Sequence, residues 1–143
     1  MTSPRMDPST SGGATDRDTA SGSTRVELPS YSAVDVPLFA AASLEVALAG
    51  QLDPEHMPRI KAAGFASVIN NRPDFEGGPQ QPRSEDLRAA AESCGLNYVH
   101  QPVIASQMTV ADVQRFHKHL QELDKPVLAF CRTGTRSGHL LRS

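Results

Sequence analysis

Apolar and polar positions follow two different patterns along the chain. Short continuous apolar runs predict buried strands, and stretches whose apolar residues recur every three or four positions predict amphipathic helices. The predicted strands are residues 44–49, 66–70, 98–103 and 126–130. The predicted helices between them are residues 53–63, 85–94 and 110–123. Strands separated by helices indicate an α/β fold with a mostly parallel sheet flanked by helices.

Local signals indicate where the first two helices begin and end. Asp53 and Pro54 form an N-cap followed by a proline at the first helical position, and Gly64 is expected to end that helix. Pro58 lies inside the predicted helix and removes a backbone donor. That helix is therefore expected to be kinked or to start late. Ser84 is predicted to cap the second helix.

The third predicted helix begins with Thr109 and carries Asp112 three positions later, which is the spacing of a capping box. Capping is therefore the expected role of Asp112. The apolar residues of this helix recur at helical spacing and are expected to share one face turned toward the core. These residues are Val110, Val113, Phe116, Leu120 and Leu123.

Composition changes sharply near residue 35. Residues 1–35 are dominated by Ser, Thr, Gly, Pro and Asp and contain few large apolar side chains, so we predict a disordered tail. Residues 36–143 are predicted to form one α/β domain. The tail lacks the pattern of a signal peptide, and its aspartates argue against a mitochondrial presequence. These aspartates are Asp7, Asp16 and Asp18.

Charge and cysteine content narrow the possible partners and compartment. A net charge of −2 over 143 residues gives no general attraction to nucleic acid or to an anionic membrane. The apolar stretch Val36–Ala49 is shorter than the ~20 residues that a membrane-spanning helix needs. Two cysteines provide no disulfide framework, and a reactive thiol favours a reducing compartment, so a cytoplasmic location is expected.

Cys131 follows the last predicted strand and opens a loop of small and basic residues. Free cysteine titrates near pH 8.5 and reacts as the thiolate. Guanidinium groups and the N-terminus of a following helix favour that anion, and a glycine at positive φ lets backbone amides turn inward. We therefore predict that Cys131 is a nucleophile inside an anion-binding cup. The predicted cup residues are Arg132, Thr133, Gly134, Thr135, Arg136 and Ser137.

The length of this loop separates two chemistries. In cysteine-dependent phosphatases, five residues lie between the cysteine and the arginine, whereas four lie between Cys131 and Arg136. Ser137 stands where such a phosphatase has its arginine, and Phe130 stands where histidine is common. The six-residue loop resembles the active loop of rhodanese sulfurtransferases, whose cysteine carries a persulfide sulfur. The last helix, from Arg136 to the chain end, would be only about 12 Å long.

A broader resemblance covers roughly Val36 to the end of the chain. It rests on the segments Ala49-Gly50-Gln51, Gly64-Phe65, Val68 to Asp74, Gln101-Pro102-Val103 and Pro126 to Ser137. Together these resemble the phosphatase-like domain of beta-lactamase-hydrolase-like proteins. The resemblance implies a fold like that of dual-specificity phosphatases. Some family members are described as sulfurtransferases associated with bacterial sulfide metabolism, which implies a thiol acceptor protein or a fused sulfur-metabolism domain as partner.

Sulfur transfer is the first of two enzymatic interpretations. The Cys131 thiolate would attack the outer sulfur of thiosulfate or a persulfide and become a persulfide, which a thiol acceptor then removes. Arg132, Arg136 and the loop amides would stabilise the negative charge. The anionic leaving group needs no general acid. The segment Ile104–Met108, where phosphatases of this fold carry an aspartic acid, contains none.

Phosphomonoester hydrolysis is the alternative. Cys131 would form a phosphocysteine, and an acid would protonate the departing oxygen. Asp74 is the best candidate for that acid, because the loop that begins with Arg72 should reach the same sheet edge as Cys131. An equally weighted interpretation of Asp74 is a turn residue after proline. Arg72 would orient the oxyanion or pair with Asp74 or Glu76.

A third interpretation is a thiol- or anion-sensing module without catalysis. Cys94, which has no basic residue within five positions in the sequence, is interpreted as a packing residue. No metal or cofactor is implied. The five histidines show no shared metal spacing with carboxylates or cysteines and are interpreted as surface or core residues.

Overall fold

A computed structural model describes residues 38–41 and 45–143. The predicted tail at residues 1–35 lies outside the described residues. In the described part, five strands form one sheet in the order β2-β3-β6-β4-β5. The strands are β2 (Leu38–Ala41), β3 (Val46–Ala49), β4 (Ser67–Asn70), β5 (Asn97–His100) and β6 (Val127–Phe130). β2 runs antiparallel to β3 and the other pairs are parallel, which confirms the mostly parallel sheet.

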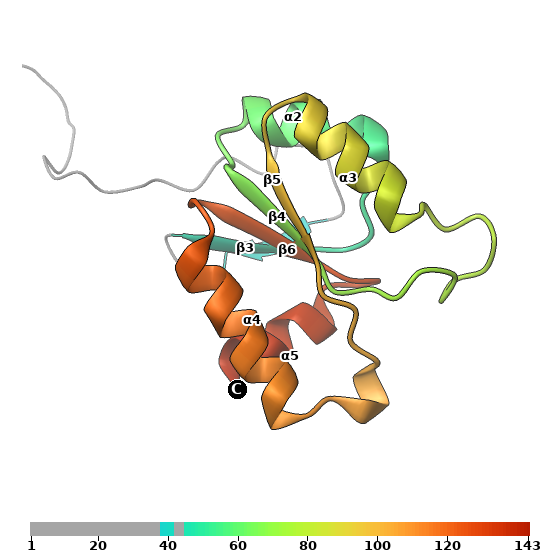
Figure 1. Cartoon of the computed structure of the whole chain (residues 1–143), viewed down its shortest axis with the longest axis vertical. Helices are drawn as coiled ribbons and strands as arrows, with labels where there is room; N and C mark the ends of the chain where they lie inside the picture. The colour runs from blue at the N-terminus through green and yellow to red at the C-terminus, as the bar shows by residue number, and fades with distance from the viewer. Residues whose placement is uncertain (1–37, 42–44) are drawn as a thin grey trace, which may run out of the picture.

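Helices cover both faces of this sheet (Figure 1). The helices α2 (Met57–Ala62) and α3 (Ser84–Ser93) lie on one face, and α4 (Val110–Glu122) and α5 (Thr135–Arg142) lie on the other. Two short 3-10 turns complete the described elements, η2 (Pro54–His56) and η3 (Ala105–Gln107). Each face of the sheet has its own apolar cluster, so the helices dock by burying side chains against a shared central layer.

β6 is the central strand and all four of its side chains are buried. A strand covered on both faces needs apolar residues throughout, which explains the uninterrupted run Val127–Phe130. Phe130 is in register with Ala49 of β3 and with Asn70 of β4. The three strands therefore end together, and the loops that follow them leave from one edge of the sheet.

The first predicted helix is divided in the structure. η2 occupies its beginning, and α2 starts only at Met57 with Pro58 in its first turn. A proline is tolerated there because the first helical amides have no partner within the helix. The expectation of a late start is therefore confirmed.

Ser84 does not cap α3. Arg83 is the N-cap residue, Ser84 is the first helical residue, and the Ser84 N–H donates to Asp74 Oδ1 at 2.8 Å. The cap thus comes from a residue ten positions earlier, which a local pattern does not reveal. At the other end of α3, half-buried Cys94 packs against the adjoining apolar cluster, which confirms its packing role.

The capping box of α4 is confirmed. The Asp112 N–H donates to Thr109 Oγ1 at 3.2 Å, and the Thr109 N–H donates to Asp112 Oδ2 at 2.9 Å. The backbone bond from Thr109 is the main reason that the pKa of Asp112 lies below its usual value. Phe116 and Leu120 are buried as expected, but the prediction for Val110 is wrong. Val110 is 72% exposed because it is the first residue of the helix, well before the turns that contact the sheet.

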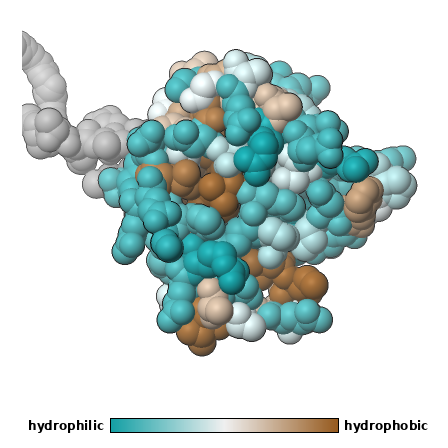
Figure 2. Space-filling view, viewed as in Figure 1, coloured by the Kyte–Doolittle hydropathy of each residue, from teal (hydrophilic) through white to brown (hydrophobic). Residues whose placement is uncertain are grey.

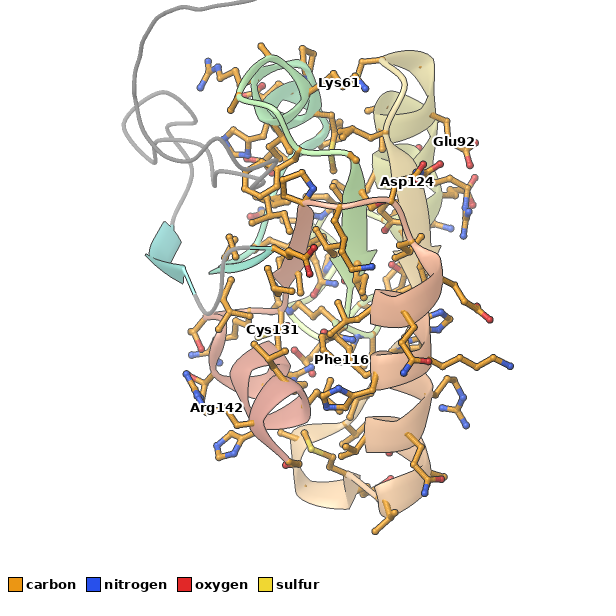
Figure 3. The ribbon with its side chains drawn as sticks, turned by 90° about the vertical axis from the view of Figure 1, so that its left-hand side faces the viewer. Lys61, Glu92, Phe116, Asp124, Cys131 and Arg142 are labelled. Atoms are coloured by element: carbon orange, nitrogen blue, oxygen red, sulfur yellow. The ribbon has the colours of Figure 1, made fainter. Side chains whose placement is uncertain are left out.

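Phe116 should account for much of the stability of this face. Its side chain is fully buried and lies on the side of α4 that faces α5 (Figure 3). Phe116→Ala is expected to lower the free energy of unfolding by roughly 3–5 kcal/mol, because it removes apolar contacts and leaves a cavity. Val110→Ala, the matched control on the same helix, should change it by less than about 0.5 kcal/mol. Urea unfolding of both variants measures this, and equal losses would contradict the described packing.

Candidate active site

Cys131 stands directly after β6, where that strand leads into α5 (Figure 3). The residue is 1% exposed, and its N–H donates to Ala49 O at 3.4 Å. On the other side of the loop, the Gly134 N–H donates to Cys131 Sγ at 3.0 Å. Figure 3 shows Lys61 and Glu92 at the opposite end of the sheet. The thiol therefore lies at the carboxyl edge, where parallel sheets bind their ligands.

Gly134 produces the turn that aims this amide at the sulfur. Its φ is +93°, in the left-handed region, and it is the N-cap residue of α5. Most other residues adopt that conformation only at a cost, so the glycine is needed for the backbone here. The predicted positive φ of Gly134 and an inward-turned amide at this position are both confirmed.

A cavity of about 440 Å³ opens onto the cysteine loop. Its lining residues are Ala105, Met108, Cys131, Arg132, Thr133, Thr135, Arg136 and His139. The structure thus brings together four predicted cup residues, namely Arg132, Thr133, Thr135 and Arg136, around the thiol. Sequence reasoning missed His139, which stands one helical turn after Arg136 and could have been found from that i,i+3 spacing.

One wall of the cavity comes from the segment Ile104–Met108, which contains no acidic residue. Ala105 and Met108 line it from η3 and the residue after η3. The preceding residue, Ile104, is 50% exposed. Figure 2 shows hydrophobic surface over this part of the molecule, at the lower right. The cavity is consequently cationic and hydrogen-bonding on the side of the cysteine loop and apolar on the side of η3.

Arg136 is nearly buried and is held by two groups. Its side chain is 10% exposed, its Nη1 donates to Val103 O at 3.0 Å, and its Nη2 donates to Glu76 Oε1 at 3.1 Å. Nη1 also lies 3.1 Å from Glu76 Oε2, so the carboxylate spans both terminal nitrogens of the guanidinium. Glu76 is the important residue that sequence reasoning did not place in the site.

Arg72 does not line the cavity. Its Nε donates to Glu76 Oε1 at 2.9 Å and its Nη1 donates to Gln51 Oε1 at 3.0 Å. The backbone of Arg72 is fixed too, because its N–H donates to Asn70 Oδ1 at 2.8 Å. The alternative of pairing with Glu76 is therefore confirmed, whereas the direct anion-binding role of Arg72 stays a prediction that this position does not support.

Glu76 is charged over a wide pH range because two cations share it. Partial burial acts to raise the pKa of Glu76, but hydrogen bonds and charge from Arg136 and Arg72 outweigh it and hold that pKa below 4.5. A carboxylate with a lowered pKa stabilises the fold above the unfolded pKa and loses that effect as pH falls through the lowered value. The pairing of Glu76 with Arg136 and Arg72 therefore persists at neutral pH.

Asp74 does not line the cavity; it caps a helix. Its Oδ1 accepts the Ser84 N–H, which is one of the amides at the start of α3 without a partner inside the helix. The carboxylate is thereby oriented toward α3, and the structure supports the turn-residue interpretation over the general acid.

Ser137 has a structural partner instead of an anion. Its side chain is fully buried, and its Oγ donates to Asn71 Oδ1 at 2.8 Å, while Asn71 Nδ2 donates to Gln101 O at 3.1 Å. The prediction that Ser137 binds the substrate anion is not supported by this position. The hydroxyl instead ties α5 to the loops after β4 and β5.

One histidine shares a metal-like arrangement with carboxylates. Potential ligand atoms of Asp53, Glu55 and His56 lie within 4.8 Å of one another, which corrects the expectation that the histidines have no such neighbours. Asp53 and Glu55 are exposed, and His56 Nδ1 already accepts the Asp53 N–H at 2.9 Å.

Within 38–41 and 45–143, no helix combines the length and the hydrophobicity required to cross a bilayer.

Comparison with known proteins identifies the family of this chain. Residues 39–142 match the family described as "Beta-lactamase hydrolase-like protein, phosphatase-like domain". The chain belongs to this family. A beta-lactamase hydrolase-like protein of Agrobacterium fabrum is 39% identical over 90 residues, which covers 63% of this chain and 21% of the relative. One from Xylella fastidiosa strain Temecula1 is 37% identical over 92 residues, covering 64% and 21%. The chain thus spans about a fifth of the length of these curated relatives.

Solved structures agree with the family assignment. A Neisseria meningitidis protein described as a candidate phosphatase is 32% identical, has a TM-score of 0.67, and covers 73% of this chain and 72% of its own. P. aeruginosa TpbA, solved in complex with pTyr, is 16% identical with a TM-score of 0.56, covering 84% and 67%. At that identity TpbA shows only that the fold is shared. The fold class expected from the sequence is therefore confirmed.

The role of Asp74 can be tested by separating its charge from its capping oxygen. Asp74→Ala is expected to lower the free energy of unfolding by about 1 kcal/mol, since it removes a helix cap. Asp74→Asn keeps Oδ1 and should retain most of the stability and turnover. Chemical denaturation and steady-state rates measure both. An Asp74→Asn variant that folds normally but turns over 10²–10⁴-fold more slowly would restore the general-acid role.

Proposed function

We propose that the chain is a cysteine-dependent phosphatase that hydrolyses phosphomonoesters through Cys131. The observation that carries this proposal is a thiol at the floor of a cation-lined cavity, in a member of a phosphatase-like family. The description of the Neisseria meningitidis protein also supports it. The order of the two enzymatic interpretations is thereby reversed, because the comparisons back hydrolysis better than sulfur transfer.

The proposed reaction has two steps. The Cys131 thiolate attacks phosphorus, an S–P bond forms, and the bond between phosphorus and the leaving oxygen breaks. Water then cleaves the phosphocysteine and releases inorganic phosphate and the thiolate. Arg132 and Arg136 line the cavity and would neutralise the phosphoryl oxygens. The Gly134 N–H would stabilise the sulfur as it leaves phosphorus.

The supply of a proton to the leaving oxygen limits the substrate class. Among the described residues that line the cavity, none is a carboxylic acid, so this proton comes from His139 or from solvent. Aryl phosphates release a less basic oxygen than alkyl phosphates and depend less on a donor. The apolar wall of Ala105 and Met108 also suits an aromatic ring. We therefore propose aryl phosphates, a class that includes phosphotyrosine, as the preferred substrates.

Sulfur transfer is the second candidate, and the length of the loop favours it. Four residues separate Cys131 from Arg136, which gives a smaller cup than the phosphatase spacing. In this reaction the thiolate takes the outer sulfur of thiosulfate, sulfite leaves with the bonding electrons, and a thiol acceptor removes the sulfur from Cys131. A thiol acceptor protein or a fused sulfur-metabolism domain would be the partner.

A paired assay separates the two candidates. The protein is given p-nitrophenyl phosphate in one arm, and thiosulfate with cyanide in the other, with Cys131→Ser as control in both. Release of p-nitrophenol and phosphate, abolished in the variant, is the expected result. Cysteine-dependent thiocyanate formation without phosphate release would instead support sulfur transfer. Inactivity in both arms would refute both enzymatic candidates and favour the sensing module.

The choice of leaving group gives a second measurement. A positioned proton donor contributes 10²–10⁴-fold to the release of a basic leaving oxygen. Because no carboxylic acid is among the described residues that line the cavity, we expect p-nitrophenyl phosphate to be hydrolysed roughly 10²-fold faster than a simple alkyl phosphate. Values of kcat/KM for the two esters test this. Equal values would show that an acid is positioned in the site after all.

A further inference from the structure

The guanidinium of Arg136 is occupied along one edge and carries an unpartnered nitrogen on the other. A guanidinium offers two pairs of parallel N–H groups, one along the Nη1–Nη2 edge and one along the Nε–Nη2 edge. Glu76 takes the Nη1–Nη2 edge, and Val103 O takes another N–H of Nη1. Arg136 Nε is buried and has no hydrogen-bond partner among the described residues.

We propose that Glu76 is a positioning residue that orients Arg136 so that its Nε–Nη2 edge binds a tetrahedral oxyanion through two parallel hydrogen bonds. A buried N–H without a partner is unfavourable. An anion that accepts a hydrogen bond from this N–H therefore gains more binding free energy than an anion that binds a solvated arginine. Arg136 lines the same cavity as Cys131, where such an anion would sit. Only the identity of the anion as a phosphoryl group rests on the proposed function.

Glu76 is itself held in place by a second arginine. Arg72 donates to Glu76 Oε1 and is in turn held by Gln51 Oε1. The residue after Glu76 is Gly77, where an added Cβ would stand 2.6 Å from Arg72 Nη2. Glycine therefore leaves the space that Arg72 occupies. Charge-assisted, bidentate pairs of this kind fix geometry as well as supplying energy.

The shared carboxylate also determines the local charge. Glu76 balances one of the two guanidiniums that contact it, so Arg72 and Arg136 together with Glu76 carry a net positive charge. Removing Glu76 would increase the positive charge but release Arg136 from its fixed orientation. If Glu76 positions Arg136, its removal should weaken anion binding. If Glu76 instead competes with the anion for Arg136, its removal should strengthen anion binding, so the two roles can be told apart.

The test measures binding of tungstate, a tetrahedral oxyanion, by calorimetry with the full chain. Glu76→Gln is expected to weaken tungstate binding about tenfold or more, the factor corresponding to one lost charge-assisted hydrogen bond. Glu76→Asp, which keeps the charge on a shorter side chain, should give an intermediate affinity. The control is Glu85→Gln, the same change at an exposed position of α3, which should bind as the wild type does.

Equal or tighter tungstate binding by Glu76→Gln would overturn the proposal, because Glu76 would then be a competitor of the anion. Absence of binding by the wild type would also overturn it. Should Glu76→Gln fail to fold, Gly77→Ala tests the same arrangement by displacing Arg72 while keeping the carboxylate, and unchanged binding would count against the proposal.

Binding needs no turnover, so a protein that binds tungstate but hydrolyses no aryl phosphate would refute the proposed function and leave this inference standing.

Discussion

A cation buried at the end of a sheet needs an opposite charge beside it, and this requirement organises the candidate site. The guanidinium of Arg136 is nearly enclosed, and Glu76 neutralises it from the loop after β4. Val103 O, beyond β5, and Gln51, beyond β3, complete the arrangement through Arg136 and Arg72. Each loop that leaves this edge of the four parallel strands therefore contributes to holding one arginine. An unpaired charge at this position would instead be strongly unfavourable.

Features encoded by neighbouring residues could be predicted from the sequence. A continuous apolar run predicts the buried strand before Cys131, and the glycine at position 134 predicts a turn with a positive φ. The capping box at Thr109 and Asp112 and the late start of α2 at Pro58 are likewise local. In each case the residues that interact lie within a few positions of one another, so a short window contains the whole interaction.

Features that depend on the packing of distant segments could not be predicted. The local sequence predicts separate roles for Asp74 and Ser84, yet one hydrogen bond joins them. The loop pattern predicts that Ser137 binds the anion, but Asn71, 66 positions earlier in the chain, accepts the hydrogen bond from its hydroxyl. Glu76 resembles any loop carboxylate until Arg136 is brought beside it from 60 positions away. Polar side chains have several possible partners, and only the folded chain selects among them.

The cavity has two walls with separate origins. The cysteine loop supplies the thiol and the cations, whereas Ala105 and Met108, on a segment without charged groups, form the apolar wall. Substitutions in the η3 segment can therefore reshape the cavity without disturbing the surroundings of Cys131. Within such an architecture, the apolar wall is free to diverge during evolution while the cysteine loop is inherited intact.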